Sequence, residues 1–153
     1  MTIPLTTMLA AAAFSAAAQA PESEPQDTVV IGDLMWATAT NGRDTNWMTA
    51  STYCRELSMG GYDDWRLPTL FELESIYVPE SEGEYKVQSP IELDAPDLWS
   101  TTNLEELGEP EDLETIRHEP WLNAWGLMFN SGIRYYSYML QPDGRALCVR
   151  DNE

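Results

Sequence analysis

The chain has 153 residues, of which 43% are hydrophobic, and its six tryptophans and seven tyrosines are enough to build the core of one domain. Its formal net charge of −18 excludes nucleic acid, anionic lipid and sulfated glycans as partners, because an acidic surface repels them. The expected partners are therefore a basic protein, a neutral glycan or a cation. The alternative is that the acidity only maintains solubility.

Residues 1 to 20 carry no charged side chain, contain an alanine-rich apolar run and end in the small-x-small pattern that signal peptidases cut. They are interpreted as a signal peptide, which predicts a periplasmic or extracellular protein. The alternative, an N-terminal helix of the folded domain, lacks support because the run has no amphipathic period. The run is also shorter than the ~20 residues that cross a bilayer, so no membrane insertion is expected.

Residues 21 to 27 are polar and contain proline, so they are expected to form a flexible lead-in. The folded domain is expected to span residues 28 to 153. Its first segment, residues 28 to 40, predicts two short strands that are joined by a turn at Gly32 and Asp33.

The next segment predicts a helix that begins after Asn46, a residue type that caps the free N–H groups of a first turn. Gly60 and Gly61 supply left-handed positions that are expected to end this helix. The residues that share its apolar face are Trp47, Ala50, Cys54 and Leu57.

A second helix is predicted after Pro68, where Thr69 and Glu72 form the pattern of a capping box. Its buried stripe consists of Leu70, Leu73, Ile76 and Tyr77. Arg66, which follows Trp65, presents a planar fork that can bind carboxylates or free backbone carbonyls beneath the turn. A structural role is expected for it, because an arginine before a helix more often ties a loop than binds a ligand.

Residues 78 to 97 are expected to form a loop, and residues 98 to 102 a short strand. Residues 104 to 120 are dense in carboxylates and poor in large apolar groups, so a solvated insertion is expected there. Such a loop can collect calcium, but it does not match an EF-hand. His118 has no second histidine or cysteine close by for a zinc site, so neither a metal site nor a cofactor is predicted.

The C-terminal third alternates like an antiparallel meander, with turns at residues 130 to 132 and 142 to 144 that predict two hairpins in series. Gln141, Pro142 and Asp143 also spell a sugar-binding tripeptide of some C-type lectins. No Trp-Asn-Asp partner strand follows, so the tripeptide is interpreted as part of a turn.

Aromatic side chains in this third offer ring faces to a glycan or a peptide. Alternation along the strand sends Tyr136 and Tyr138 to one face and Tyr135 to the other, so about half of the rings are expected in the core. The candidate ligand-binding aromatics are Trp121, Trp125, Tyr136 and Tyr138.

Cys54 and Cys148 are the two cysteines of the chain. An even count in a secreted protein favours a disulfide between them. The alternative is two buried free thiols.

A set of residues spread over nearly all of the expected mature chain forms a recognisable pattern: Trp47, Ala50, Tyr53, Cys54, Leu57, Gly61, Tyr62, Asp64, Trp65, Arg66, Leu67, Pro68, Thr69, Glu72, Leu73, Trp99, Ser100, Cys148, Val149 and Arg150. In these residues the chain resembles the Lcl C-terminal domain family of secreted bacterial proteins. Collagen-like members of the family are associated with adhesion to glycosaminoglycans, an activity that the strong negative charge of this chain argues against.

The run from Arg66 to Thr69, followed by Glu72, also resembles a segment of formylglycine-generating enzymes. This resemblance implies an α+β fold of the C-type-lectin-like kind, with two helices packed on twisted antiparallel sheets. The residues expected to act as its fold signature are Trp65, Arg66, Pro68, Thr69, Glu72, Trp99 and Arg150.

Formylglycine-generating enzymes use a C-terminal pair of cysteines to bind copper, whereas here only Cys148 lies in that region. A lone thiolate cannot form the two-sulfur site, so that catalysis is expected to be absent and no catalytic residue is predicted. The expected function is a secreted or periplasmic, non-catalytic binding or adhesion module for a glycan or protein partner. The alternatives are a diverged enzyme on the same scaffold and a structural subunit of a secreted assembly.

Overall fold

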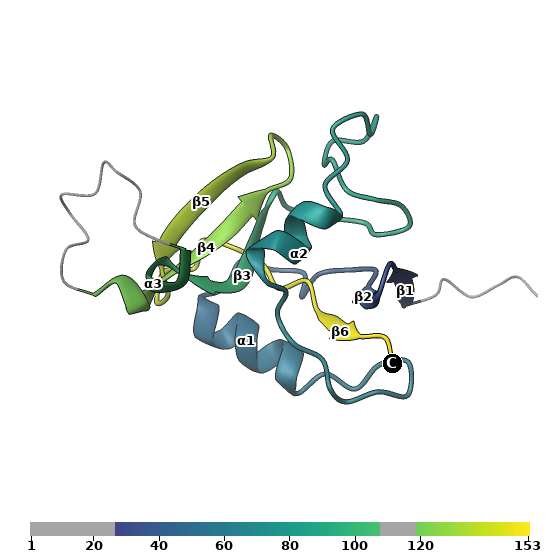
Figure 1. Cartoon of the computed structure of the whole chain (residues 1–153), viewed down its shortest axis with the longest axis horizontal. Helices are drawn as coiled ribbons and strands as arrows, with labels where there is room; N and C mark the ends of the chain where they lie inside the picture. The colour runs from purple at the N-terminus through teal and green to yellow at the C-terminus, as the bar shows by residue number, and fades with distance from the viewer. Residues whose placement is uncertain (1–26, 108–118) are drawn as a thin grey trace, which may run out of the picture.

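The computed structural model describes residues 27 to 107 and 119 to 153 as an α+β fold with two small antiparallel sheets (Figure 1). One sheet has the strand order β1-β2-β6 and the other β3-β4-β5. The strands are β1 (Thr28–Ile31), β2 (Leu34–Ala37), β3 (Asp97–Asn103), β4 (Asn123–Met128), β5 (Ile133–Tyr138) and β6 (Val149–Asp151). The helices are α1 (Trp47–Arg55), α2 (Leu70–Ser75), α3 (Leu104–Leu107) and the 3-10 turn η1 (Pro120–Leu122). The expected signal peptide, nearly all of the lead-in, and His118 lie outside the described residues.

The first sheet joins the two ends of the described chain. β1 and β2 form the predicted hairpin, in which Gly32 takes the positive φ of 62° that the turn requires. β6 pairs with the other side of β2, so that Val149 lies opposite Trp36. The prediction of two hairpins in series is therefore wrong for the second one. The segment before β6 runs beside β3 instead of β5, because Arg145 exchanges backbone hydrogen bonds with Asp97 and Trp99, and residues 146 to 149 are then buried.

The second sheet contains the first of those two predicted hairpins, β4 and β5, and it is confirmed. β3 includes the strand predicted at residues 98 to 102 and pairs with β4, with an irregular register between Trp99 and Asn103. Residues 78 to 96 contain no helix or strand, as expected.

Helix α1 begins where the sequence predicts, since the Asn46 side chain accepts a hydrogen bond from the N–H of Thr49 at 2.8 Å. It ends earlier than predicted, at Arg55. Gly60 and Gly61 do not end it: they form a separate turn, around which Met59 and Tyr62 exchange two backbone hydrogen bonds. The helix closes instead through tight bonds to the carbonyls of its own last turn.

Helix α2 carries the predicted capping box. The Thr69 hydroxyl accepts from the N–H of Glu72 at 3.1 Å, and the Glu72 carboxylate accepts from the N–H of Thr69 at 2.7 Å. Leu70, Leu73 and Ile76 are fully buried, as the stripe predicts. This local pattern fixes where α2 starts and which face it buries.

The two longer helices cover opposite faces of the β3-β4-β5 sheet. Leu98 and Leu127 belong to the core cluster that contains the buried residues of α2. Trp99, the residue after Leu98, and Ala124, three residues before Leu127, belong to the cluster that contains those of α1. Successive residues of a strand point to opposite faces, so the sheet separates the two clusters. In Figure 1, α2 lies across β3 and α1 lies below the sheet.

The predicted disulfide is confirmed, because Cys54 and Cys148 are bonded with their Cα atoms 5.4 Å apart. It ties α1 to the residue that precedes β6, and both cysteines are buried. The expectation of a wholly solvated insertion over residues 104 to 120 is wrong at its start. Residues 104 to 107 form α3, whose Leu104 is completely buried because α3 packs against β3 and β4.

Candidate functional site

Arg66 binds carboxylates of the domain itself. Its guanidinium donates two hydrogen bonds to the Glu72 carboxylate, at 2.8 and 2.9 Å, and a third to Asp151 at 2.9 Å. Burial acts to raise the pKa of Glu72, but the hydrogen bonds from Arg66 and from the backbone of Thr69 outweigh it and hold the pKa below its usual range. Arg66 thus connects the start of α2 to β6.

Other expected fold-signature residues also bond to neighbouring segments of the domain, as a structural role requires. Trp65 and Trp99 are buried, and their indole N–H groups donate to the carbonyls of Met59 and Thr45. The Pro68 carbonyl accepts from the N–H of Thr101 at 2.8 Å. Arg150 donates to both carboxylate oxygens of Asp64 and lies 3.7 Å from the centroid of the Tyr62 ring.

Three of the four candidate aromatics lie on one face of the β3-β4-β5 sheet, and the fourth lies in η1. Trp125 and Tyr136 pack edge to face with centroids 5.5 Å apart, on the sheet face that α2 covers. Tyr138 follows Tyr136 by two residues on the same strand and therefore shares that face. Trp121 lies in η1 and is half exposed. Tyr135 points to the opposite face, as alternation predicts, and it lines a cavity that the sequence did not indicate.

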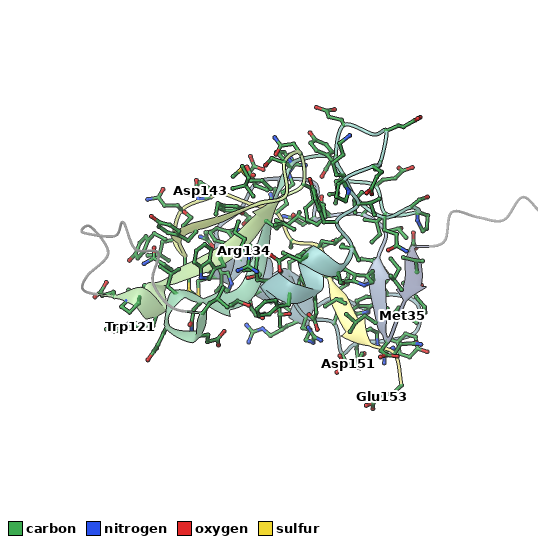
Figure 2. The ribbon with its side chains drawn as sticks, turned by 45° about the horizontal axis from the view of Figure 1, so that its top comes forward. Met35, Trp121, Arg134, Asp143, Asp151 and Glu153 are labelled. Carbon is green, nitrogen blue, oxygen red and sulfur yellow. A yellow bond between two sulfur atoms is a disulfide. The ribbon has the colours of Figure 1, made fainter. Side chains whose placement is uncertain are left out.

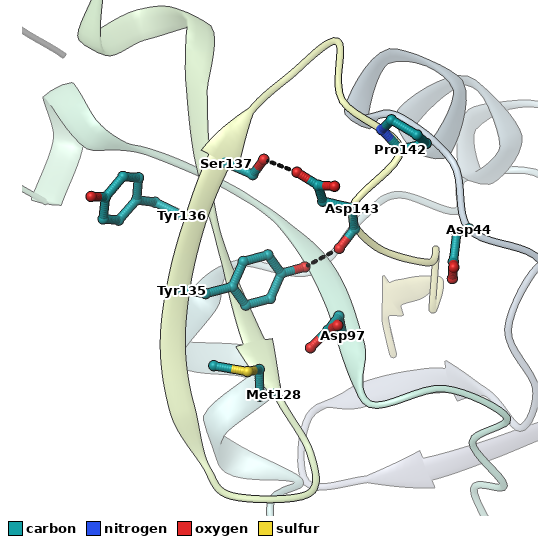
Figure 3. Close-up of a pocket in the computed structure, with 8 residues that line it drawn as sticks. All are labelled: Asp44, Asp97, Met128, Tyr135, Tyr136, Ser137, Pro142 and Asp143. Carbon is teal, nitrogen blue, oxygen red and sulfur yellow. Dashed lines mark hydrogen bonds between the residues drawn. The ribbon is translucent and has the colours of Figure 1, made fainter. Parts of the chain in front are cut away.

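This cavity, the acidic pocket, has a volume of about 410 Å³ and lies beside β5 (Figure 3). Three carboxylates converge on it from separate parts of the chain: the loop before α1, the start of β3, and the segment after β5. The lining residues are Asp44, Asp97, Met128, Tyr135, Tyr136, Ser137, Pro142 and Asp143.

Tyr135 forms a fixed wall of the acidic pocket. Its ring packs on Trp99, with centroids 6.2 Å apart, and its hydroxyl donates to the carbonyl of Asp143 at 3.4 Å. Two glycines leave room for it: a Cβ on Gly126 would overlap the ring, and one on Gly144 would lie 2.6 Å from the hydroxyl oxygen. Glycine is thus required at both positions for the ring to lie where it does.

Two of the three carboxylates have partners within the domain. Asp44 accepts from Arg145 Nε at 3.0 Å, and the same guanidinium also pairs with Asp94 at 2.5 Å. Asp143 accepts a hydrogen bond from the Ser137 hydroxyl. Asp97 is different, because its Oδ1 atom is buried and has no hydrogen-bond partner.

The electrostatics of the acidic pocket follow from this arrangement. Burial, and then the negative charges of Asp44 and Asp143, raise the pKa of Asp97 above its usual range. Burial, and then the three carboxylates, also raise the pKa of Tyr135. Both shifts disfavour negative charge, so a cationic group placed in the acidic pocket would relieve the repulsion.

Sequence reasoning missed this site. Asp44 and Asp97 are two of 26 acidic residues, and they lie in segments with no recognisable motif. Asp143 was interpreted only as a turn residue. Tyr135 gave a usable signal, because strand alternation separates it from Tyr136.

In the described parts of the chain, no three or more histidine, cysteine, aspartate or glutamate side chains are grouped so that they could hold a metal ion. Nor does any described helix have the length and apolar character needed to cross a bilayer.

Comparison with models of known protein families gives a match over most of this chain. A family model described as the Lcl C-terminal domain matches residues 30 to 150, which include every residue of the acidic pocket. No curated protein matches the sequence.

Proposed function

The chain belongs to the Lcl C-terminal domain family, and we propose that it is a secreted or periplasmic, non-catalytic binding module of C-type-lectin-like fold. Two helices that pack around two antiparallel sheets support the fold assignment. The disulfide supports export, because such bonds persist in oxidising compartments.

The observation that carries the binding proposal is the state of Asp97. It is a carboxylate with one buried oxygen that has no partner, in a cavity with two further acids and a rigid tyrosine wall. An ammonium or guanidinium group in the cavity would supply the counter-charge that the carboxylate of Asp97 lacks, and an aromatic face also attracts cations. The ligand is therefore a protein or an amino sugar that presents a cationic group.

Titration of the protein with Nα-acetyl-arginine amide and with glucosamine, followed by NMR chemical shifts, tests this proposal. At least one of the two should shift residues that line the acidic pocket, whereas neutral N-acetylglucosamine should not. Asp97→Asn should reduce the affinity at least tenfold, since the substitution removes the unpaired charge. Asp63→Asn is the matched control, because it removes the same charge from an exposed residue outside the pocket. Equal binding by the two variants would overturn the proposal.

A diverged enzyme is the second candidate, and the raised pKa of Asp97 favours it, because a carboxyl whose pKa burial and neighbouring charges raise is typical of a general acid. The neighbouring Ser137 donates to Asp143 and both cysteines form the disulfide, so neither supplies an evident nucleophile. Hydrolysis of chromogenic glycosides or esters by the wild-type protein, lost in Asp97→Asn, would favour this candidate.

A further inference from the structure

An exposed apolar patch lies on segments that adjoin the acidic pocket. Its members are Met48, Trp121 and Leu140, whose exposed fractions are 53%, 51% and 58%. Large apolar side chains exposed to this degree on neighbouring segments are typical of a surface that a partner covers.

Backbone hydrogen bonds hold these three segments together. The N–H of Trp47, next to Met48, donates to the carbonyl of Met139, next to Leu140, at 3.0 Å. The N–H of Met139 in turn donates to the carbonyl of Leu122, next to Trp121, at 2.8 Å. Figure 2 shows Trp121 and Asp143 at the same end of the molecule, with Met35 and Glu153 at the other.

Two segments run from the acidic pocket to the apolar patch. Asp143 lines the pocket and Leu140 belongs to the patch, three residues apart, so their Cα atoms are at most ~11 Å from one another. Asp44 of the pocket and Met48 of the patch are four residues apart, so their Cα atoms are at most ~14 Å from one another. Two short segments thus connect the pocket to the patch, so that one extended ligand can reach both.

Charge decides which occupant fits this surface. A second copy of the chain would bring another −18 charges toward the acidic pocket, and the exposed Glu105, Glu106 and Glu119 add negative charge beside α3 and η1. Like charges in contact oppose association, so a copy of this chain is a poor occupant. An amino sugar would use the acidic pocket but would gain little from Met48 and Leu140, whereas a basic protein segment with apolar side chains would use both the pocket and the patch.

We propose that the acidic pocket and the apolar patch together bind an extended segment of a partner protein, in which a lysine or arginine lies about three residues from large apolar side chains. The spacing follows from the ~11 Å limit and a rise of about 3.3 Å per extended residue. The basic side chain enters the acidic pocket against Asp97 and Tyr135. This inference rests on the proposed function of the acidic pocket and adds the class of its partner.

Selection of peptides from a random phage-displayed library against the whole protein tests the inference. Enriched peptides should contain lysine or arginine with leucine, isoleucine, phenylalanine or tryptophan two to four residues away. Synthetic copies should bind at least tenfold more weakly to Asp97→Asn and at least threefold more weakly to Leu140→Ser. Asp63→Asn and Val30→Ser are the matched controls, since they remove a charge and an exposed apolar side chain elsewhere, and they should bind like the wild type.

The outcomes separate the two proposals. Basic peptides that bind Asp97→Asn weakly but bind Leu140→Ser like the wild type would overturn the role of the apolar patch. They would leave the proposed cation binding by the acidic pocket in place. Enriched peptides that bind Asp97→Asn as well as wild type, or a selection that enriches none, would overturn the assignment of a peptide partner. In that case the titration with glucosamine decides whether the acidic pocket itself binds a cation.

Discussion

Asp97 shows at the scale of one residue how a binding site can oppose folding. Its partly buried carboxylate faces Asp44 and Asp143, while the neighbouring cation Arg145 is engaged by Asp44 and Asp94. Tyr135 offers its ring to the site, and its hydroxyl donates to the backbone carbonyl of Asp143. A charge in this position destabilises the free protein, so retaining it is consistent with a role in binding.

Asp97→Asn should stabilise the protein at neutral pH by about 0.5–2 kcal/mol, because it removes an unpaired charge from a crowded acidic site. The raised pKa of Asp97 means that its protonated form favours the folded state and that this contribution is lost as the pH rises through the folded-state pKa. Thermal unfolding as a function of pH should therefore show the variant more stable at pH 7 and equal to wild type near pH 3. A variant less stable than wild type at pH 7 would contradict this account.

The limits of sequence reasoning are clearest for the same residue. The start of α2 leaves a strong local signal in the sequence, because Thr69 and Glu72, which form its capping box, are three residues apart. Asp97 acquires its properties only from residues more than 40 positions away, such as Asp44 and Asp143. Nothing in the local sequence distinguishes it from the other acids.

At the scale of elements, hydrogen bonds at the N-terminal end of α2 attach this helix to the rest of the domain. Glu72 serves two structures at once, the capping box with Thr69 and the paired hydrogen bonds with Arg66, which also reaches Asp151 in β6. The loss of one side chain should therefore loosen both a helix end and the attachment of the last strand.

Glu72→Ala should lower the free energy of unfolding by about 1–3 kcal/mol, because it removes a cap and takes from Arg66 the carboxylate to which it donates two hydrogen bonds. Glu74→Ala is the matched control on the same helix. Its pair with Arg134 is more exposed and is expected to contribute at most about 1 kcal/mol. Urea unfolding of both variants measures the difference, and equal losses would refute the dual role of Glu72.

The hairpin of β4 and β5 depends on a small residue beneath Tyr135. Gly126→Ala should destabilise the protein by more than about 2 kcal/mol, since its Cβ would overlap the tyrosine ring and lie 2.5 Å from the carbonyl oxygen of Leu98. Gly83→Ala is the control, because its Cβ would meet only Tyr85 O at 3.3 Å and a serine hydroxyl at 3.7 Å. Thermal unfolding and the near-ultraviolet signal of the tyrosine compare the two. A Gly126→Ala protein with the stability of the wild type would show that packing against Gly126 does not fix the position of the Tyr135 ring.

Elements with local signals were predicted, whereas the position of β6 was not. The helix caps, the Gly32 turn and the β4-β5 hairpin depend on residues close in sequence. β6 lies beside β2, more than 110 residues away, and the turn residues before it suggest a hairpin that does not form. The unbroken apolar run of residues 146 to 149 is a sequence signal for a buried segment, but it does not say which strand β6 joins.

At the scale of the whole molecule, one covalent bond joins the halves of the fold. Cys54 and Cys148 are 94 positions apart and lie in the core cluster beneath α1, where the disulfide connects this helix to the strand that closes the first sheet. The sequence predicted this bond from the cysteine count alone.

Reduction of the disulfide should lower the free energy of unfolding by about 4–5 kcal/mol, because a long loop in the unfolded chain is released. Thermal unfolding with and without a phosphine reductant under partly denaturing conditions measures the loss, with thiol titration to confirm reduction. The Cys54→Ala, Cys148→Ala double variant should be destabilised and indifferent to the reductant. A reduced protein that unfolds at the same temperature as the oxidised one would contradict this expectation.

The pairing of β2 with both β1 and β6 also determines how the domain can be displayed. The first and last strands of the described chain are separated by a single strand, so both ends emerge from the same sheet. Glu153 lies at the end of the molecule opposite to Asp143 and Trp121 (Figure 2). An anchor, a neighbouring domain or an immobilising tag attached to the C-terminus would therefore point the acidic pocket away from its support, ready for a partner arriving from the outside.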